Sequence, residues 1–186
     1  MRLFKFSALA AAVALAGCVD VDLTTTITGA DSAQVSGYME IQRQMLDMMG
    51  GSEAFCDQAE GGTLTVTDTT ARCDMVVNGT FAEVFQGDEP KPTATDQGDG
   101  TVLVSFPIGA MTADSAEMRN DPQSAAMMRP MLEGHTFTVR VAGAEIVSSN
   151  GEIAADGHSA SFTMPLVEML NPEFNPPATF DTVVRY

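Results

Sequence analysis

Apolar and polar positions alternate along the chain after residue 18. From Val19 to Thr28, apolar side chains alternate with aspartates and threonines, and many of these residues are β-branched. A period of two is typical of a strand with one buried face. Turn residues follow over Gly29–Ser32, and the alternation resumes from Gln34 to Glu40. The pattern predicts two successive strands joined by a turn.

The period changes at Ile41. Ile41, Met45, Met48 and Met49 have the spacing of one helix face, and Gly50-Gly51 ends the run. Three further segments are predicted to contain short helices. They are 81–85, the region 114–134, in which Pro122 opens a second segment, and 166–170.

Most of the remaining chain reads as strands separated by turns. Tight hairpins are predicted at Asn150-Gly151 and Asp156-Gly157, where both central positions need positive φ, so the C-terminal part is predicted to be an antiparallel meander. The stretch 87–100 lacks an apolar period and reads as an exposed loop. The predicted strands are 63–67, 72–77, 101–107, 135–141, 144–148, 152–155, 159–164 and 179–186.

These elements predict an α+β fold. It has a mostly antiparallel sheet of about eight strands, packed with three or four short helices. After the first 17 of the 186 residues, 169 remain, which suits one domain over 18–186.

The first 17 residues have the pattern of a secretory leader. Arg2 and Lys5 precede an apolar run from Phe6 to Leu15, which is too short to span a bilayer of about 30 Å as a helix. Leu15-Ala16-Gly17-Cys18 resembles a lipobox. This resemblance implies cleavage before Cys18 and lipidation of its thiol. The alternative is an ordinary secreted protein with a cysteine near the cleavage site.

The predicted location follows from this signal. A lipidated Cys18 anchors the domain to a membrane of the bacterial envelope. Val19, rather than aspartate, follows the cysteine, which favours the outer membrane with the domain facing the periplasm.

The net charge of the chain disfavours some classes of binding partner. Without Arg2 and Lys5, the chain has 7 basic and 25 acidic residues, a formal charge of −18. Nucleic acid and anionic headgroups are poor partners for such a surface. No nucleic-acid partner is expected.

Cys56 and Cys73 remain as a pair once Cys18 is committed to lipid. In an oxidising compartment such a pair favours a structural disulfide. The alternatives are a metal pair or a redox-active dithiol, which usually have closer spacing.

Methionine is frequent, at 13 of 186 residues. Met45, Met48 and Met49 on one predicted helix, with Met128 and Met131 on another, form a candidate face for an apolar ligand. The same residues together with Met127 could alternatively form a thioether site for Cu(I), and His135 lies four residues beyond Met131.

Catalytic patterns are missing from the sequence. There is no G-x-S-x-G, H-E-x-x-H or paired C-x-x-C motif. His135 and His158 are predicted to be exposed residues at strand ends. No catalytic residue, metal ligand or cofactor site is therefore assigned, although a hydrolase with a site that the sequence hides is a third possibility.

Two stretches resemble the LppM-type bacterial lipoproteins. One is Cys18-Val19-Asp20-Val21-Asp22-Leu23, followed by a turn and Val35-Ser36-Gly37. The other runs from Val141 to Gly151, with Asp156-Gly157 after it. The matching positions are few and are turn and strand residues. The resemblance implies an anchored α+β envelope domain that binds lipid or glycolipid, and it supplies no catalytic residue.

The leading hypothesis is a lipid-anchored, non-enzymatic envelope protein that binds an apolar, lipid-like ligand or a protein partner through its methionines. The alternative is a periplasmic Met-rich copper-binding lipoprotein.

Overall fold

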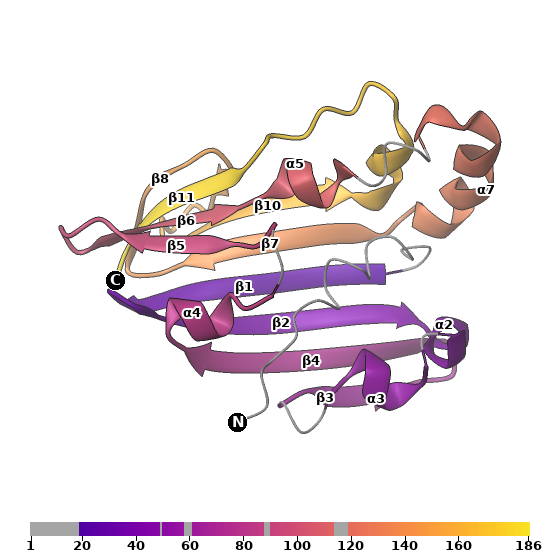
Figure 1. The fold of residues 1–186 in the computed structure, drawn as a ribbon, viewed down its shortest axis with the longest axis horizontal. Coiled ribbons are helices and arrows are strands. Elements are labelled where there is room, and N and C mark those ends of the chain that lie inside the picture. The colour runs from indigo at the N-terminus through magenta and orange to yellow at the C-terminus, as the bar shows by residue number, and fades with distance from the viewer. Residues whose placement is uncertain (1–18, 49, 58–60, 88–89, 114–118) are drawn as a thin grey trace.

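The computed structural model describes residues 19–48, 50–57, 61–87, 90–113 and 119–186. Within these ranges the chain forms eleven strands in two sheets (Figure 1). The larger sheet has the order β3-β4-β2-β1-β7-β10-β9, and the smaller one has the order β5-β6-β11-β8. The larger sheet contains β1 (Val19–Gly29), β2 (Ser32–Gln42), β3 (Thr63–Val66), β4 (Thr70–Gly79), β7 (Thr136–Ala142), β9 (Glu152–Ile153) and β10 (Ser159–Pro165). The smaller sheet contains β5 (Thr93–Asp96), β6 (Thr101–Phe106), β8 (Glu145–Ser149) and β11 (Phe180–Arg185).

The helices of the described residues are short. They are α2 (Arg43–Met48), α3 (Ser52–Phe55), α4 (Phe81–Val84), α5 (Ile108–Met111), α7 (Pro122–Leu132) and the 3-10 helix η3 (Leu166–Leu170). None of the helices that the structure describes is long and apolar enough to cross a membrane.

The two central strands confirm the alternation of the sequence. Along β1 every second residue from Val19 to Ile27 is buried, and β1 pairs with β2 in an antiparallel ladder from Val19↔Ile41 to Gly29↔Ser32. The strands predicted over 63–67 and 72–77 are present as well, and they form the antiparallel pair β3–β4. The α+β class is therefore confirmed.

The prediction of one sheet of about eight strands is wrong, because the described residues form eleven strands in two sheets. The seven-stranded sheet is mostly antiparallel, as predicted, but it is mixed because one of its strand pairs is parallel. β1 pairs with β7 in parallel, from Val21↔Phe137 to Thr26↔Ala142. Alternation shows which residues share a face but carries no information on strand direction. Five other strands lie between β1 and β7 in the chain, so no short turn indicates that the two strands pair.

The predicted C-terminal meander is present only in part. β9 and β10 form the hairpin predicted at Asp156-Gly157, and β10 also pairs with β7 in the larger sheet. β8 and β11, the strands before and after this hairpin, pair with each other in the four-stranded sheet, so they do not continue it.

The reason lies partly at Asn150-Gly151. The Asn150 side-chain amide donates to the Thr179 carbonyl oxygen at 2.8 Å and accepts from the Asp181 backbone N–H at 2.8 Å. These bonds hold Asn150 to the β11 region. Gly151 does not have positive φ, contrary to the prediction, whereas Gly157 does, at 74°.

Two element boundaries differ from the prediction. The stretch 87–100 contains β5, which adds an edge strand to the smaller sheet. The helix predicted from Ile41 begins at Arg43, because Ile41 is still paired with Val19 in the ladder. In contrast, Pro122 opens α7 as predicted, after the N-cap Asp121.

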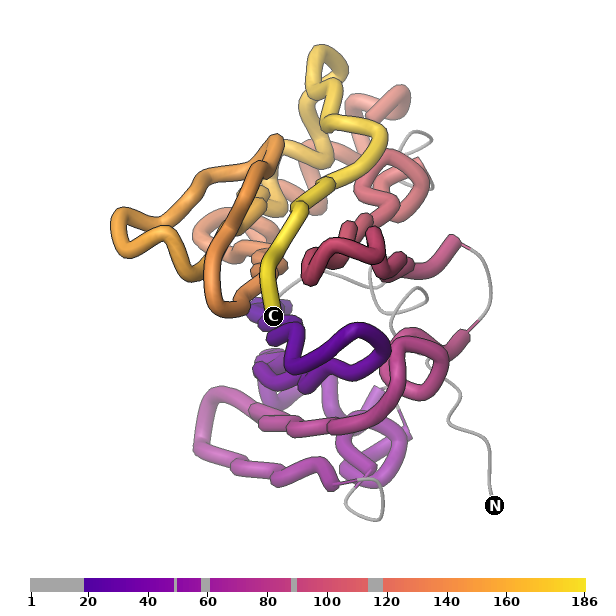
Figure 2. Tube along the Cα trace, turned by 90° about the vertical axis from the view of Figure 1, so that its left-hand side faces the viewer, coloured from indigo at the N-terminus to yellow at the C-terminus, as the bar shows by residue number. Residues whose placement is uncertain are grey.

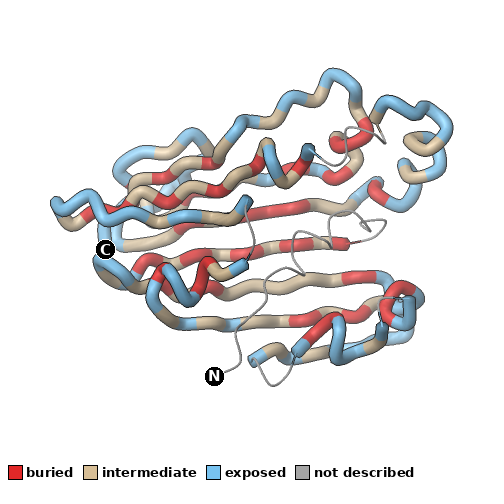
Figure 3. Tube along the Cα trace, in the orientation of Figure 1, coloured by how far each residue is buried: buried red, intermediate tan, exposed pale blue. Residues whose placement is uncertain are grey.

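The core lies between the two sheets. Phe180 of β11 stacks on Phe106 of β6 at 6.0 Å between ring centroids and contacts Phe162 of β10 at 6.2 Å. Phe85, just after α4, meets Phe106 edge-on at 6.3 Å, so α4 belongs to the same packed side of the larger sheet. The end-on view shows the smaller sheet above the β1–β2 hairpin (Figure 2), and buried residues run through the middle of both sheets (Figure 3).

Candidate functional site

One end of the seven-stranded sheet collects most of the features that the sequence singled out. Val19 at the start of β1 pairs with Ile41, Ile41 pairs with Ala71, and Ala71 pairs with Val66. These four residues form one row across four strands. We call this row and the elements beyond it the Val19 end.

The helix α2 follows β2 directly at the Val19 end. Its Met45 and Leu46 are buried, and the Arg43 backbone N–H donates to the Thr69 carbonyl oxygen at 2.8 Å. Met48 points the other way, with 76% of its surface exposed. The helix is thus held to the core by one face and presents a methionine to solvent on another.

The helix α7 also ends there. The His135 backbone N–H donates to the Leu132 carbonyl oxygen at 3.2 Å, and β7 starts at the next residue. Leu132 is buried and Met128 packs partly against the core, whereas Met127 and Met131 are 69% and 41% exposed. Figure 1 shows α2 and α7 beyond the same end of the strands.

Exposed apolar side chains are therefore concentrated at the Val19 end. Among the described residues, eight large hydrophobic side chains are exposed, and four of them lie at this end. Those four are Met48, Val66, Met127 and Met131, and the others are Val76, Val147, Ile153 and Tyr186.

The two helices differ in charge from the rest of the chain. α2 contains one arginine and one aspartate, and α7 contains one arginine and no acidic residue, a formal charge of +1 for the two together. The whole chain has a formal charge of −16. Because α3 at the same end contains Glu53, the three helices together are neutral, and Asp121 and Glu133 flank α7.

The candidate methionine face is divided between two places. α2 packs near β2 and β4, whereas α7 packs near η3, beyond β10 on the other side of β1. Met45 is buried and Met48 is exposed, so the two do not present their sulfur atoms to the same surroundings. Met49 lies outside the described residues. Binding of a ligand or of Cu(I) by this set stays a prediction.

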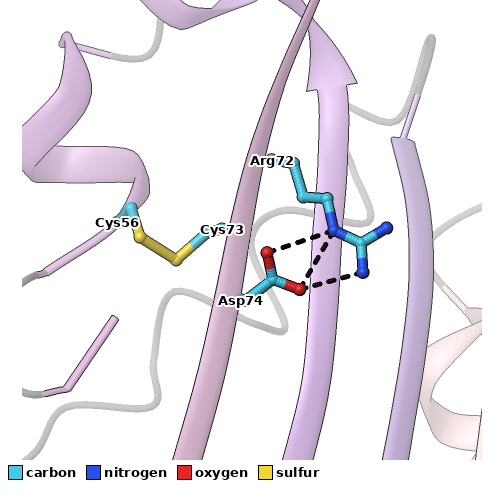
Figure 4. Close-up of a disulfide and its surroundings, with 4 residues drawn as sticks. All are labelled: Cys56, Arg72, Cys73 and Asp74. Carbon is cyan, nitrogen blue, oxygen red and sulfur yellow. Dashed lines mark hydrogen bonds and ion pairs between the residues drawn. A yellow bond between two sulfur atoms is a disulfide. The ribbon is translucent and has the colours of Figure 1, made fainter. Parts of the chain in front are cut away.

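The predicted disulfide between Cys56 and Cys73 is confirmed. Cys56 follows α3, and Cys73 lies on the buried face of β4, with 5.5 Å between their Cα atoms (Figure 4). The bridge joins the α2–α3 segment to the sheet behind it. It therefore supports the half of the Val19 end that carries Met48.

A polar cluster lies on the outer face of the sheet, on the strand that carries Cys73. Arg72 donates from Nε and Nη2 to Asp74 at 2.9–3.2 Å, and its guanidinium carbon lies 3.5 Å from the centroid of the Tyr38 ring (Figure 4). The hydrogen bond to Asp74 is the main cause that raises the pKa of Arg72 above its ordinary value. Because the side chains are 36% and 45% exposed, solvent screens this pair.

Sequence reasoning missed the polar contacts between β1 and β7. Asp20 lies 2.8 Å from Nδ1 of His135, and Arg140 donates to Asp22 at 3.2 Å and to Thr24 at 3.1 Å. His135 is half-buried, not an exposed strand end as predicted. These contacts could not be predicted from neighbouring residues, because they depend on the parallel pairing of two strands whose paired residues are more than 110 positions apart in the sequence.

His158 fits its prediction. It is exposed at the start of β10, and its Nδ1 lies 2.7 Å from the Ala144 carbonyl oxygen. In the described ranges, no group of three or more His, Cys, Asp or Glu side chains is placed to hold a metal ion. Cys18 and the predicted signal peptide lie outside these ranges.

Comparison with known proteins gives one informative match. No family model and no curated protein matches the chain. The NMR structure of the folded domain of LppM from Mycobacterium tuberculosis is similar, with a TM-score of 0.51 and 15% sequence identity over 90% of each chain. The LppM-like relationship that the sequence suggested is thus found in the fold, and this chain has an LppM-like α+β fold.

Proposed function

We propose that this protein is a lipid-anchored, non-enzymatic domain of the bacterial envelope. We further propose that it binds an apolar, lipid-like partner through the exposed side chains of the Val19 end. One observation carries the proposal. The central strand β1 starts at Val19, the residue directly after the lipobox cysteine Cys18, and the exposed methionines gather at that same end.

The anchor follows from the chemistry of the leader. Cleavage before Cys18 with acylation of its thiol and amine gives two or three acyl chains. Each acyl methylene buried in the bilayer contributes about 0.8 kcal/mol to the free energy of membrane binding. One acyl chain therefore binds the protein reversibly, whereas two or more hold it at the membrane permanently. The LppM-like fold supports an envelope role, since the leader and the fold suggest the same class of protein.

The location within the envelope rests on two features. Val19 in place of aspartate after the cysteine favours sorting to the outer membrane, with the domain in the periplasm. The Cys56–Cys73 disulfide suits an oxidising compartment of this kind.

Several polar side chains of the sheet join or stabilise strands. Asp20 and Asp22 bond to β7, Asp74 bonds to Arg72, and Ser149 bonds to Thr182 at 2.9 Å. The proposed binding role therefore rests on the exposed apolar side chains and not on these polar contacts.

The anchor is tested by metabolic labelling of cells that express the full chain. The parent should incorporate labelled palmitate and appear in the outer-membrane fraction. Cys18→Ser should lose both properties. The matched control is the double variant Cys56→Ser, Cys73→Ser, which should keep the label because its lipobox is intact. Labelled palmitate on the Cys18→Ser variant would contradict the proposal.

A further inference from the structure

We propose that the lipid bilayer itself covers the exposed apolar side chains of the Val19 end. In this arrangement Met48, Met127, Met131 and Val66 enter the headgroup region of the membrane that holds Cys18, and β1 stands upright on that membrane. The inference rests on the proposed lipid anchor and names the partner that the exposed methionines contact.

The first argument is the length of the tether. Consecutive Cα atoms are about 3.8 Å apart, so the anchored residue and Val19 are neighbours without any linker. Val19 is itself buried within the domain as the first residue of β1. A domain attached this closely to a membrane has no freedom to move its Val19 end away from the lipid surface.

The second argument is the position of the exposed apolar groups. Val66 lies in the same row of the sheet as Val19, three strands away. Met48 lies six residues beyond the Gln42 end of β2, and Met131 lies five residues before the start of β7. Elements that lie in a membrane interface bury their apolar face by about 5–10 Å. Val66, Met48 and Met131 lie at or beyond the end of the sheet that the anchor brings to the membrane, so they are placed for burial to this depth.

The third argument is charge. A formal charge of −18 on the mature chain would repel an anionic membrane, but the helices α2, α3 and α7 contain two arginines and two acidic residues and are neutral together, with Asp121 and Glu133 flanking α7. Arg43 and Arg129 are exposed beside the methionines, and long basic side chains can keep their charge at the headgroups while their stems lie along apolar surface. Arg43 uses one N–H on the Thr67 carbonyl oxygen at 3.1 Å, and a guanidinium has five donors.

The residue type supports the same partner. Methionine is unbranched and adapts to irregular apolar surroundings, which suits contact with mobile acyl chains. The exposed methionines lie in two places at one end of the domain, and the anchor makes the membrane the partner that is present at that end.

The arrangement predicts how the rest of the domain is displayed. β1 has 11 residues, and a strand rises by about 3.3 Å per residue, so its far end would stand about 33 Å above the membrane. Tyr186 and the C-terminal end lie at that opposite end of the molecule (Figure 1). The outer face of the sheet would then stand perpendicular to the bilayer, with Arg72, one residue from Ala71 of the Val19 row, close to the headgroups.

The test uses the full, acylated protein reconstituted into phosphatidylcholine vesicles. Met48→Cys and Met127→Cys are each labelled with an environment-sensitive nitrobenzoxadiazole probe, since Cys18 is acylated and Cys56 and Cys73 are oxidised. Matched controls are Val76→Cys and Val147→Cys, which are 54% and 49% exposed in the parent but lie away from the Val19 end. We expect a blue-shifted emission that nitroxide-bearing lipids quench at positions 48 and 127, and neither effect at 76 and 147.

The outcomes separate the two proposals. If the protein floats with the vesicles but all four probes report water, the inference is overturned and the anchor stands. A blue shift at 48 or 127 without quenching by lipid nitroxides would reveal a second copy or another protein on this surface, which also overturns it. If the wild-type protein carries no acyl chain and does not float, both proposals fail.

Discussion

Asp20 joins the starts of β1 and β7. One oxygen of its carboxylate lies 2.8 Å from Nδ1 of His135, and the other accepts the Thr136 backbone N–H at 2.8 Å. A single side chain therefore closes the junction between two parallel strands at the end of the sheet. This junction also positions α7, whose last residues precede His135.

The first prediction concerns this junction. Asp20→Ala removes both hydrogen bonds and leaves the Thr136 N–H without its acceptor, so we expect a loss of about 1–3 kcal/mol in the free energy of unfolding. Urea denaturation of the purified protein measures the change. The matched control is Asp31→Ala in the exposed β1–β2 turn, which should change stability by less than about 0.5 kcal/mol. Equal effects of the two substitutions would show that the Asp20 contacts contribute nothing.

Sequence reasoning succeeded where the determinants are local. The alternation from Val19 to Thr28, the position of Pro122 at the start of α7 and the pairing of two leftover cysteines each depend on neighbouring residues or on a count. It failed where the determinant is distant. The parallel pairing of β1 with β7 has no signal in either strand, because both directions of pairing bury the same face.

The candidate site follows the same division. The methionine spacing predicted two helices with partly buried faces, and Met45 and Met128 do pack inward. The gathering of Met48 and Met131 at one sheet end depends on the mixed topology, so it could not be predicted from spacing. The β8 segment is a further case, since Asn150 bonds to the distant residues Thr179 and Asp181 rather than forming a tight hairpin.

The second prediction concerns the disulfide. Its two cysteines are 17 residues apart, and closing a loop of about this size contributes roughly 3 kcal/mol in the chain-entropy model. The double variant Cys56→Ser, Cys73→Ser should lose stability of that order in urea denaturation. Thiol counting on the denatured, unreduced protein should find neither cysteine free, and two reactive thiols would contradict the bridge.

The third prediction concerns acid. Hydrogen bonds from the backbone and hydroxyl of Thr80 lower the pKa of Glu83, and bonds from Ser124 and the Gln123 N–H lower the pKa of Asp121. A carboxyl with a lowered pKa stabilises the fold above the ordinary range of about pH 4, and this contribution is lost as the pH falls through the folded-state value.

Glu83→Gln and Asp121→Asn keep a capping side chain but cannot titrate. At pH 7 both variants should unfold at lower urea concentrations than the parent, because a neutral amide lacks the contribution of the ionised carboxyl. Below about pH 4 the parent should lose stability faster than the variants. Parallel pH profiles for parent and variants would show that these two caps do not contribute to acid sensitivity.

The fourth prediction separates the proposed function from copper binding. Met45 is buried and Met48 is exposed, so their sulfur atoms do not face the same site. We therefore expect no stoichiometric binding when the full protein is titrated with Cu(I) under reducing conditions in competition with a Cu(I) chelator. One equivalent of tightly bound Cu(I), abolished by replacing Met45, Met48 and Met49 with leucine, would instead support the copper-binding alternative.

The last prediction uses two glycines that are required for different reasons. A Cβ on Gly151 would lie 2.5 Å from both a Phe180 ring carbon and the Ser161 carbonyl oxygen, whereas a Cβ on Gly157 would meet nothing within 4 Å. Gly157 instead has a φ of 74°. Asparagine tolerates that backbone conformation, but it has a Cβ like any other residue.

We therefore expect Gly157→Asn to be less costly than Gly157→Ala, with a loss below about 1 kcal/mol. At position 151, alanine and asparagine should both cost about 1–3 kcal/mol, because either one forces Phe180 or the β10 backbone to move. Urea denaturation of the four variants gives the comparison. Rescue by asparagine at 151 would mean that backbone conformation, rather than the close approach of the β10 backbone and Phe180, requires glycine there.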